Sequence, residues 1–406
     1  MSLNNMGSSN DPENDLLMIP GPVRIHPRVQ RAMNVPIFGH RTSQFRNIYL
    51  KTVDMFKSYL KTSYDLFILA GSGTAALEAA IANFIVPNET VVLSFINGKF
   101  SERAGKIAQA FGAKVTNVPV EWGLGVTPDL VEKHLKENPN ISMVTVCHNE
   151  TSTGVISPIK EIGAICRKYD VLLAVDGVTS VFGAYVCPEE QNIDLLASGS
   201  QKSWGLPPGL SMIVVGPRAW KKMPAKRYTY YFDLQSYKKK HPSGDTPYTP
   251  AITLIYGLFE ALTMMIEETE EKRTSRHAWC AELIRTGVQA LGWELLSKDG
   301  FHSPVVTAVK LPDNIKPSLL RKGTEKFGIQ ISGAQDKLAS NHIRIASMNF
   351  VSERDVISTF AIIEVALNKL GIKTELGVSI KAIQEKIVNN PNIVLAFEDS
   401  GAGGDE

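Results

Sequence analysis

The chain has 406 residues, of which 44% are hydrophobic and 21% charged, enough to bury one large core and one smaller core. Its formal charge of +2 gives no electrostatic reason to expect nucleic acid or an anionic membrane as a partner. No apolar stretch reaches the roughly 20 residues that span a bilayer, and the polar N-terminus has no signal-peptide core, so we expect a cytoplasmic protein. The four cysteines show no paired spacing and indicate neither a disulfide framework nor a metal site.

Composition and pattern divide the chain into four parts. Residues 1–15 are polar and are expected to be disordered, and residues 398–406 form a glycine-rich acidic tail that is expected to be flexible. Alternating strand and helix patterns predict a large domain over residues 16–272. A linking helix and a smaller C-terminal domain are expected over residues 273–397.

Two features near the N-terminus are candidates for a site. Gly21 lies in the stretch Pro20–Val23, which predicts a rigid turn. Arg41 precedes a segment with apolar residues at helical spacing, where its positive charge opposes the helix dipole. An anion near Arg41 would explain this placement, and a surface arginine is the alternative.

A glycine-rich turn follows the predicted strand over residues 66–70. Ser72, Gly73 and Thr74 lie between that strand and a strongly helix-forming stretch, which is the arrangement of a phosphate site at a helix N-terminus. The spacing of the glycines also fits a dinucleotide-binding fingerprint, which requires an acidic residue after the next strand. Asn97 stands there instead, and this disfavours the nicotinamide cofactors.

The rest of the large domain alternates strands with helices. Strands are predicted over residues 91–95, 115–120, 142–147 and 171–175, and helices over residues 100–112 and from residues 127 and 157 onward. Repeated strand–helix–strand units predict an α/β fold with a mostly parallel central sheet and helices on both faces.

An acid and an amine follow two of the later strands. Asp176 ends the apolar run 171–175, at the strand end where open α/β sheets bind ligands. Lys202 lies in a loop of small residues and prolines, where partial burial would lower its pKa and leave an amine able to attack a carbonyl. The alternatives are a helix-capping aspartate and a solvated lysine.

The phosphate turn, Asp176 and Lys202, in this order, resemble the class V aminotransferases of pyridoxal phosphate (PLP) fold type I. The nearest branch is that of the alanine–glyoxylate and serine–pyruvate aminotransferases, and the resemblance runs from about Pro20 to Leu370. It implies that Lys202 carries the cofactor aldehyde and that Asp176 pairs with the protonated pyridine nitrogen. It also implies a homodimer with active sites at the interface.

The resemblance assigns further cofactor contacts. Phe100 would stack on the pyridine ring and Val178 would pack beneath it. Thr151 and Gln201 would hydrogen-bond its polar groups. Thr249 matches a residue that reaches the partner's cofactor phosphate, and the family's accompanying tyrosine is replaced here by threonine.

The C-terminal part contains a candidate substrate residue. A strand over residues 342–346 carries Arg344 between isoleucines, and an arginine so placed needs an anion, for which a carboxylate has the matching geometry. The family uses the matching arginine for the α-carboxylate of the amino acid, and its N-terminal segment, here Gly21, lies near the substrate. Residues 373–397 are predicted to add a helix and a short strand.

These parts predict ping-pong transamination between a small amino acid and a 2-oxo acid. Alanine or serine is the expected donor and glyoxylate or pyruvate the acceptor, and aspartate becomes plausible where Arg41 faces the site. A cysteine desulfurase would need a catalytic cysteine and histidines at the positions of Phe100 and Gln201. A non-enzymatic binding protein that retains the fold is the more distant alternative.

Overall fold

The computed structural model describes residues 15–391. The disorder expected before residue 15 and the flexibility expected of the acidic tail concern residues outside this range, as does the end of the strand expected toward residue 397.

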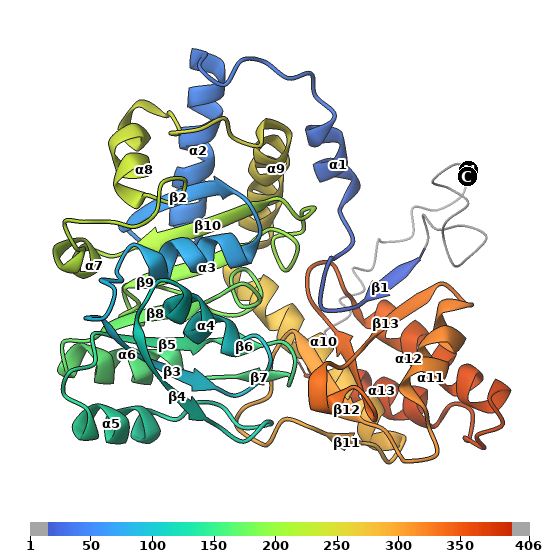
Figure 1. Ribbon diagram of the computed structural model, residues 1–406. Coiled ribbons are helices and arrows are strands. Elements are labelled where there is room, and N and C mark those ends of the chain that lie inside the picture. The colour runs from blue at the N-terminus through green and yellow to red at the C-terminus, as the bar shows by residue number, and fades with distance from the viewer. Residues whose placement is uncertain (1–14, 392–406) are drawn as a thin grey trace, which may run out of the picture.

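A seven-stranded sheet in the order β2-β10-β9-β8-β5-β3-β4 forms the centre of the larger part (Figure 1). Its strands are β2 (Asp65–Ala70), β3 (Val91–Ile96), β4 (Lys114–Pro119), β5 (Met143–Cys147), β8 (Leu172–Asp176), β9 (Leu195–Gly199) and β10 (Leu210–Val215). β10 runs antiparallel to both neighbours and the other pairs are parallel, so the predicted α/β fold with a mostly parallel sheet is confirmed. Every residue of β5, β8, β9 and β10 is buried, as in a sheet covered on both faces.

Helices cover this sheet from both sides. Successive residues of β2 point to opposite faces, so Phe67 and Ile68 belong to different hydrophobic clusters. The Ile68 cluster includes buried residues of α1 (Pro27–Met33), α2 (Ser43–Tyr59), α5 (Pro128–Glu137), α6 (Ile159–Lys168) and α9 (Ile252–Glu268). The Phe67 cluster includes residues of α3 (Gly73–Ala82), α4 (Glu102–Ala110), α7 (Pro217–Lys222) and α8 (Leu234–Lys240).

A second, five-stranded sheet lies beside the first, in the order β1-β13-β14-β12-β11 (Figure 1). Its strands are β1 (Leu16–Met18), β11 (Glu294–Leu295), β12 (Val306–Lys310), β13 (Ile329–Gly333) and β14 (His342–Ala346). A third cluster packs these strands against α10 (Glu270–Ala290), α11 (Pro317–Glu325), α12 (Glu353–Lys369) and α13 (Val378–Val388). β1 pairs in parallel with β13, so the first described strand belongs to the sheet of the C-terminal residues. The domain limits otherwise stay a prediction.

The remaining elements are short, and several helix ends follow from their residues. A two-stranded ribbon joins β6 (Asn149–Glu150) and β7 (Val155–Ile156), and 3₁₀ turns cover His241–Ser243 and Asp336–Leu338. Thr127 caps α5 by accepting a hydrogen bond from the Leu130 N–H, and Ser352 and Asp355 form a capping box at α12.

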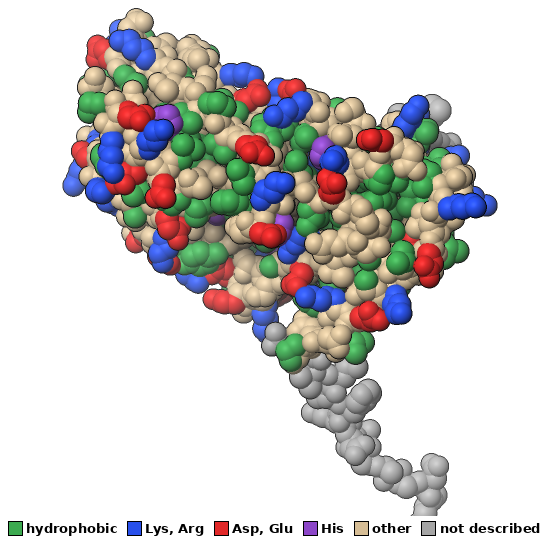
Figure 2. Space-filling view, turned by 90° about the horizontal axis from the view of Figure 1, so that it is seen from below, with side chains coloured by type: hydrophobic (Ala, Val, Ile, Leu, Met, Phe, Trp, Pro, Cys, Tyr) green, Lys and Arg blue, Asp and Glu red, His purple; other side chains and the backbone are tan. Residues whose placement is uncertain are grey.

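The face of the molecule seen in Figure 2 carries acidic and basic side chains interspersed with one another. This mixture agrees with the small formal charge. Among the described residues, no helix has both the length and the apolar character required to cross a membrane.

Candidate active site

Strands β8 and β9 bring an acid and an amine to one edge of the large sheet. Asp176 is the last residue of β8, and Lys202 lies three residues beyond the end of β9. The two strands are parallel neighbours with Asp176 opposite Ala197, so both ends open on the same side. The negative charge of Asp176 favours protonated Lys202, and the positive charge of Lys202 favours ionised Asp176.

Asp176 is a buried carboxyl group, 7% exposed. Its Oδ1 accepts a hydrogen bond of 3.0 Å from the Val178 N–H, and within residues 15–391 no lysine or arginine forms an ion pair with it. Burial raises its pKa to about 6, against the opposing effect of the Val178 N–H. A buried carboxylate needs a cation, and a protonated pyridine nitrogen would be one.

Lys202 is held against the N-terminal segment. Its Nζ donates a hydrogen bond to the Pro20 carbonyl. A Cβ on Gly21 would lie 2.7 Å from Lys202 Cδ and 2.9 Å from Nζ, and the φ of Gly21 is +101°, so this position requires glycine. Burial, and then the positive charge of Arg344, lower the pKa of Lys202 to about 8.

The glycine-rich turn forms the start of α3, as predicted. Ser72 precedes the helix without capping it through its side chain, and the first N–H groups of a helix have no acceptor within it. A Cβ on Gly73 would lie 2.6 Å from Val178 Cγ2. The turn therefore packs directly on Val178, two residues after Asp176. The predicted role of this turn as an anion site, beside the carboxylate, stays a prediction that this geometry permits.

Glu150 fixes the loop that carries Phe100. Its carboxylate accepts hydrogen bonds from the N–H groups of Phe100 at 3.1 Å and Ser101 at 2.8 Å, and from the Ser152 hydroxyl at 2.6 Å. These contacts give Glu150 a structural role. The described residues contain no group of three or more His, Cys, Asp or Glu side chains that could hold a metal ion.

Two further polar side chains lie near these groups. The hydroxyls of Thr151 and Thr179 are 2.6 Å apart, and the Thr151 carbonyl accepts from Arg344 Nη1 at 3.4 Å. The buried Oε1 of Gln201 has no partner among the described residues. An unpaired buried amide oxygen next to Lys202 fits a site completed by a polar ligand.

Arg344 lies in the middle of β14 and is 5% exposed. Its Nε and Nη2 donate to the Gly333 carbonyl at 3.0 and 2.8 Å, and Nη2 also lies 3.4 Å from Ser332 Oγ. No carboxylate within residues 15–391 pairs with it, which disfavours a purely structural salt bridge. Burial lowers its pKa to about 10, so it stays charged at neutral pH and needs an anion.

Comparison with known proteins identifies the family. The family model "Aminotransferase class-V" matches residues 32–334. The chain belongs to the class V aminotransferases. An uncharacterised aminotransferase of Methanocaldococcus jannaschii is 40% identical over 370 residues, which is 90% of this chain and 96% of the relative.

Two other relatives carry more specific names. The serine–glyoxylate aminotransferase of Methylorubrum extorquens is 31% identical, and the match spans 95% of this chain and 99% of that protein. The crystal structure of ureidoglycine–glyoxylate aminotransferase from Bacillus subtilis matches with a TM-score of 0.87 at 31% identity, over 92% of this chain and 98% of that one. The class V fold thus extends over nearly the whole chain.

Two predicted site residues form no hydrogen bond or ion pair with Lys202 or Asp176 within residues 15–391. Arg41 is half-exposed, with Nη1 3.6 Å from Asp245 Oδ1. Thr249 is exposed at the segment that leads into α9. Thr246 is buried, and its hydroxyl donates to the Tyr248 carbonyl. The roles of Arg41 and Thr249 stay predictions that depend on a partner subunit.

Sequence reasoning missed Arg103 and the Pro20 carbonyl. Arg103 Nη1 donates to Thr74 Oγ1 at 2.8 Å, and its guanidinium lies over the Phe100 ring. The spacing of three residues between Phe100 and Arg103 was the available signal. The contact of Lys202 with Pro20 spans 182 residues of sequence and had no local signal.

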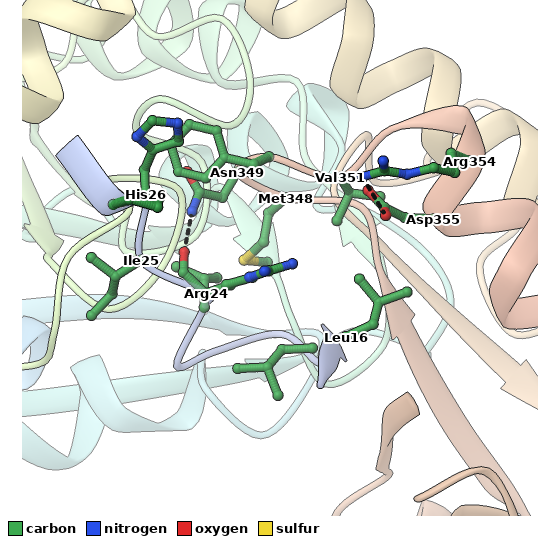
Figure 3. A pocket seen from close by; sticks show the side chains of 13 residues that line it. Leu16, Arg24, Ile25, His26, Met348, Asn349, Val351, Arg354 and Asp355 are labelled. Atoms are coloured by element: carbon green, nitrogen blue, oxygen red, sulfur yellow. Dashed lines mark hydrogen bonds and ion pairs between the residues drawn. The ribbon is translucent and has the colours of Figure 1, made fainter. Parts of the chain in front are cut away.

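A cavity of about 210 Å³ lies elsewhere, between the N-terminal segment and the loop that follows β14 (Figure 3). Its polar groups are largely engaged with one another. Asn349 donates to the Arg24 carbonyl at 2.7 Å, and Asp355 serves in the capping box and contacts Arg354 at 3.7 Å. Neither Lys202 nor Asp176 lines this cavity, so it is not the class V site.

Proposed function

We propose that this chain binds PLP at Lys202 and transaminates small amino acids with a 2-oxo acid. The observation that carries the proposal is the buried carboxylate of Asp176, which shares a sheet edge with Lys202 and lacks an ion-pair partner among residues 15–391. PLP supplies an aldehyde for an amine and a protonated ring that withdraws electrons from the substrate's α-carbon. Both groups have a matching residue here.

The chain's own residues would divide the work. The start of α3 would bind the phosphate and Asp176 would hold the proton on the ring nitrogen. Arg344 would bind and orient the substrate carboxylate through its guanidinium. Lys202, with its pKa lowered to about 8, would take the proton from the α-carbon of the substrate and return it to the aldehyde carbon of the cofactor.

The proposed remaining contacts follow the same geometry. Phe100 would stack on the ring and Val178 would pack on its other face. Thr151 and Gln201 would hydrogen-bond polar groups of the cofactor, and Gly21 would leave room for Lys202 and substrate. Thr249 and Arg41 would enter the site of a partner subunit, so the proposed assembly is a homodimer.

Glyoxylate is the proposed acceptor, with pyruvate as the second choice, because two relatives described above are named for glyoxylate. The proposed donors are serine and alanine, since Arg344 is the buried arginine facing this site without an acidic partner. Aspartate is the proposed third donor, with Arg41 of a partner subunit as the cation. A cytoplasmic location remains proposed on composition.

The test is transamination by the purified holoenzyme, using serine, alanine and aspartate as donors against glyoxylate, pyruvate and 2-oxoglutarate. We expect glyoxylate-dependent loss of serine or alanine, a yellow protein, and loss of both activity and colour in Lys202→Ala. Retention of activity and colour in Lys202→Ala would refute the site. Arg41→Ala should reduce turnover of aspartate and leave that of alanine unchanged.

The same preparation tests the desulfurase alternative. Cys147, Cys166, Cys187 and Cys280 are all buried. Burial raises the pKa of Cys147 and raises those of Cys166 and Cys280 to about 12, so these thiols are poorly suited to nucleophilic attack. Release of sulfide from cysteine at a rate comparable to transamination would contradict the proposed chemistry.

A further inference from the structure

Arg103 connects two elements of the site. It lies in the first turn of α4, where its Nη1 donates a 2.8 Å hydrogen bond to the hydroxyl of Thr74, in the first turn of α3. Its guanidinium carbon lies 5.3 Å from the centroid of the Phe100 ring. One side chain thus contacts both the candidate phosphate turn and the aromatic residue proposed to stack on the cofactor ring.

The charge of Arg103 has no local compensation. Its neighbour Glu102 is already paired with Lys106 at 2.7 Å and Lys99 at 3.3 Å. No carboxylate within residues 15–391 forms an ion pair with Arg103. A cation in the first turn of α4 also opposes that helix's dipole, so the stability of α4 does not explain its presence.

The field of Arg103 reaches the catalytic groups. Burial raises the pKa of Asp176 and lowers that of Lys202; the positive charge of Arg103 makes a smaller contribution, which opposes the rise at Asp176 and adds to the fall at Lys202. A phosphate monoester at the start of α3 would bring a charge of about −1.5 to −2 to the Thr74 side of the site. The phosphate would thereby supply the counter-charge that Arg103 lacks among residues 15–391.

We propose that Arg103 is a positioning residue for the cofactor phosphate, which holds the Thr74 hydroxyl in place and faces the phosphate with its positive charge. This inference rests on the proposed function, because the phosphate is that of PLP. The competing role does not involve the phosphate: Arg103 would only support the Phe100 ring and contribute the modest energy of a cation–π contact.

Binding of PLP and of pyridoxal, which lacks the phosphate, separates the two roles. Dissociation constants would be measured by absorbance and fluorescence titration of apo-protein for wild type, Arg103→Gln and Arg103→Lys. The matched control is Lys106→Gln, which removes the same charge from an exposed position on the same helix. We expect Arg103→Gln to weaken PLP binding by about tenfold or more and to leave pyridoxal binding unchanged.

Rescue by charge is the second expected result: Arg103→Lys should retain most of the PLP affinity, and Lys106→Gln should match wild type. Equal losses for PLP and pyridoxal in Arg103→Gln, or no loss for PLP, would overturn the proposal. Failure of wild type to bind PLP would instead refute the proposed function.

Inorganic phosphate provides a readout that needs neither PLP nor the Arg103 substitutions. We expect phosphate to raise the unfolding midpoint of wild-type apo-protein more than that of Thr74→Val, which removes the acceptor of the Arg103 hydrogen bond. Equal shifts in the two proteins would overturn the role of the Arg103–Thr74 pair, even if Arg103→Gln fails to fold.

Discussion

Asp176 carries an electrostatic cost in the protein without its cofactor. Burial raises its pKa from 3.8 to about 6. Ionised Asp176 therefore lowers the free energy of unfolding at neutral pH. Lys202 is in the opposite position, because burial lowers its pKa from 10.5 to about 8. Burial thus disfavours the charged forms of both groups, which leaves a carboxyl group that a cation would stabilise as its ion and an amine able to react with an aldehyde.

Replacement of Asp176 by asparagine should therefore stabilise the apo-protein at neutral pH. The folded-state pKa exceeds the unfolded one, so the wild-type free energy of unfolding falls as pH rises from about 4 through 6 and stays low above it. Asparagine keeps an acceptor for the Val178 N–H and has no such dependence. We expect a gain of up to about 3 kcal/mol at pH 8 that shrinks toward pH 4.

Urea unfolding of both apo-proteins at several pH values measures this difference. The variant should also bind PLP more weakly than wild type, because the partner of the ring nitrogen is lost. A variant less stable than wild type at pH 8 would contradict the assigned cost.

Charged residues at buried strands or strand ends, which need a partner of opposite charge or a shifted pKa, were predictable from the sequence. The structure places Asp176 at the end of β8, Lys202 in the loop after β9 and Arg344 within β14, where the sequence pattern located them, and their roles stay predictions. Neither Arg103 nor the structural role of Glu150 was predicted from the sequence. Their partners lie on other elements, and local sequence does not encode which loops meet.

At the scale of elements, the contact between α3 and the loop after β8 determines the shape of the site. Gly73 and Val178 approach so closely that a Cβ on Gly73 would also lie 3.2 Å from Val178 Cγ1. Gly199, at the end of β9, lies on the same side, since its own added Cβ would be 2.8 Å from Gly73 Cα. Glycine at these positions allows three elements to converge on one small volume.

Gly73→Ala should therefore separate α3 from β8, with a loss of about 1–3 kcal/mol in stability and a weaker affinity for PLP. Val178→Ala removes the atoms that the new methyl group would meet. The double variant should regain much of the stability lost by Gly73→Ala, which a double-mutant cycle of urea unfolding energies would measure. If the loss in the double variant equalled the sum of the losses in the two single variants, the clash would lie elsewhere.

Helix α5 begins where the sequence pattern predicted, and α10 does not. Residue 127 was predicted to start a helix, and Thr127 is the N-cap of α5, accepting a hydrogen bond from the Leu130 N–H. α10 begins at Glu270 and not at residue 273, because Thr269 adopts a φ of +70° and caps the Lys272 N–H. A threonine in this conformation is uncommon and is set by the packing of α9 against α10, which sequence pattern does not show.

At the scale of the whole molecule, the proposed homodimer explains several exposed groups. Thr249 is exposed and Arg41 is half-exposed, and within residues 15–391 neither forms a hydrogen bond or an ion pair with Lys202. Val35 and Ile37, between α1 and α2, are 47% and 64% exposed, and large apolar side chains at a surface favour an interface. A second copy that covers this segment would also bring the Arg41 region toward another subunit.

Sites shared between subunits predict complementation. Lys202→Ala and Thr249→Val should each lower transamination, but mixed dimers would contain one site with both residues intact. We expect activity to rise when the two variants are unfolded together and refolded, compared with each refolded alone. Unchanged activity in a mixture shown by sedimentation to contain dimers would place Thr249 and Lys202 in the same subunit's site.

The pairing of β1 with β13 has a mechanical consequence. Met18 is tied to the smaller sheet, while Pro20, two residues later, touches the amine of Lys202 on the larger one. Any movement of one sheet against the other would pull on this short connection, so the proposed binding of substrate at Arg344 and the freedom of Lys202 would be linked. One extra residue between Met18 and Pro20 would slacken the connection, and should change turnover more than it changes substrate affinity.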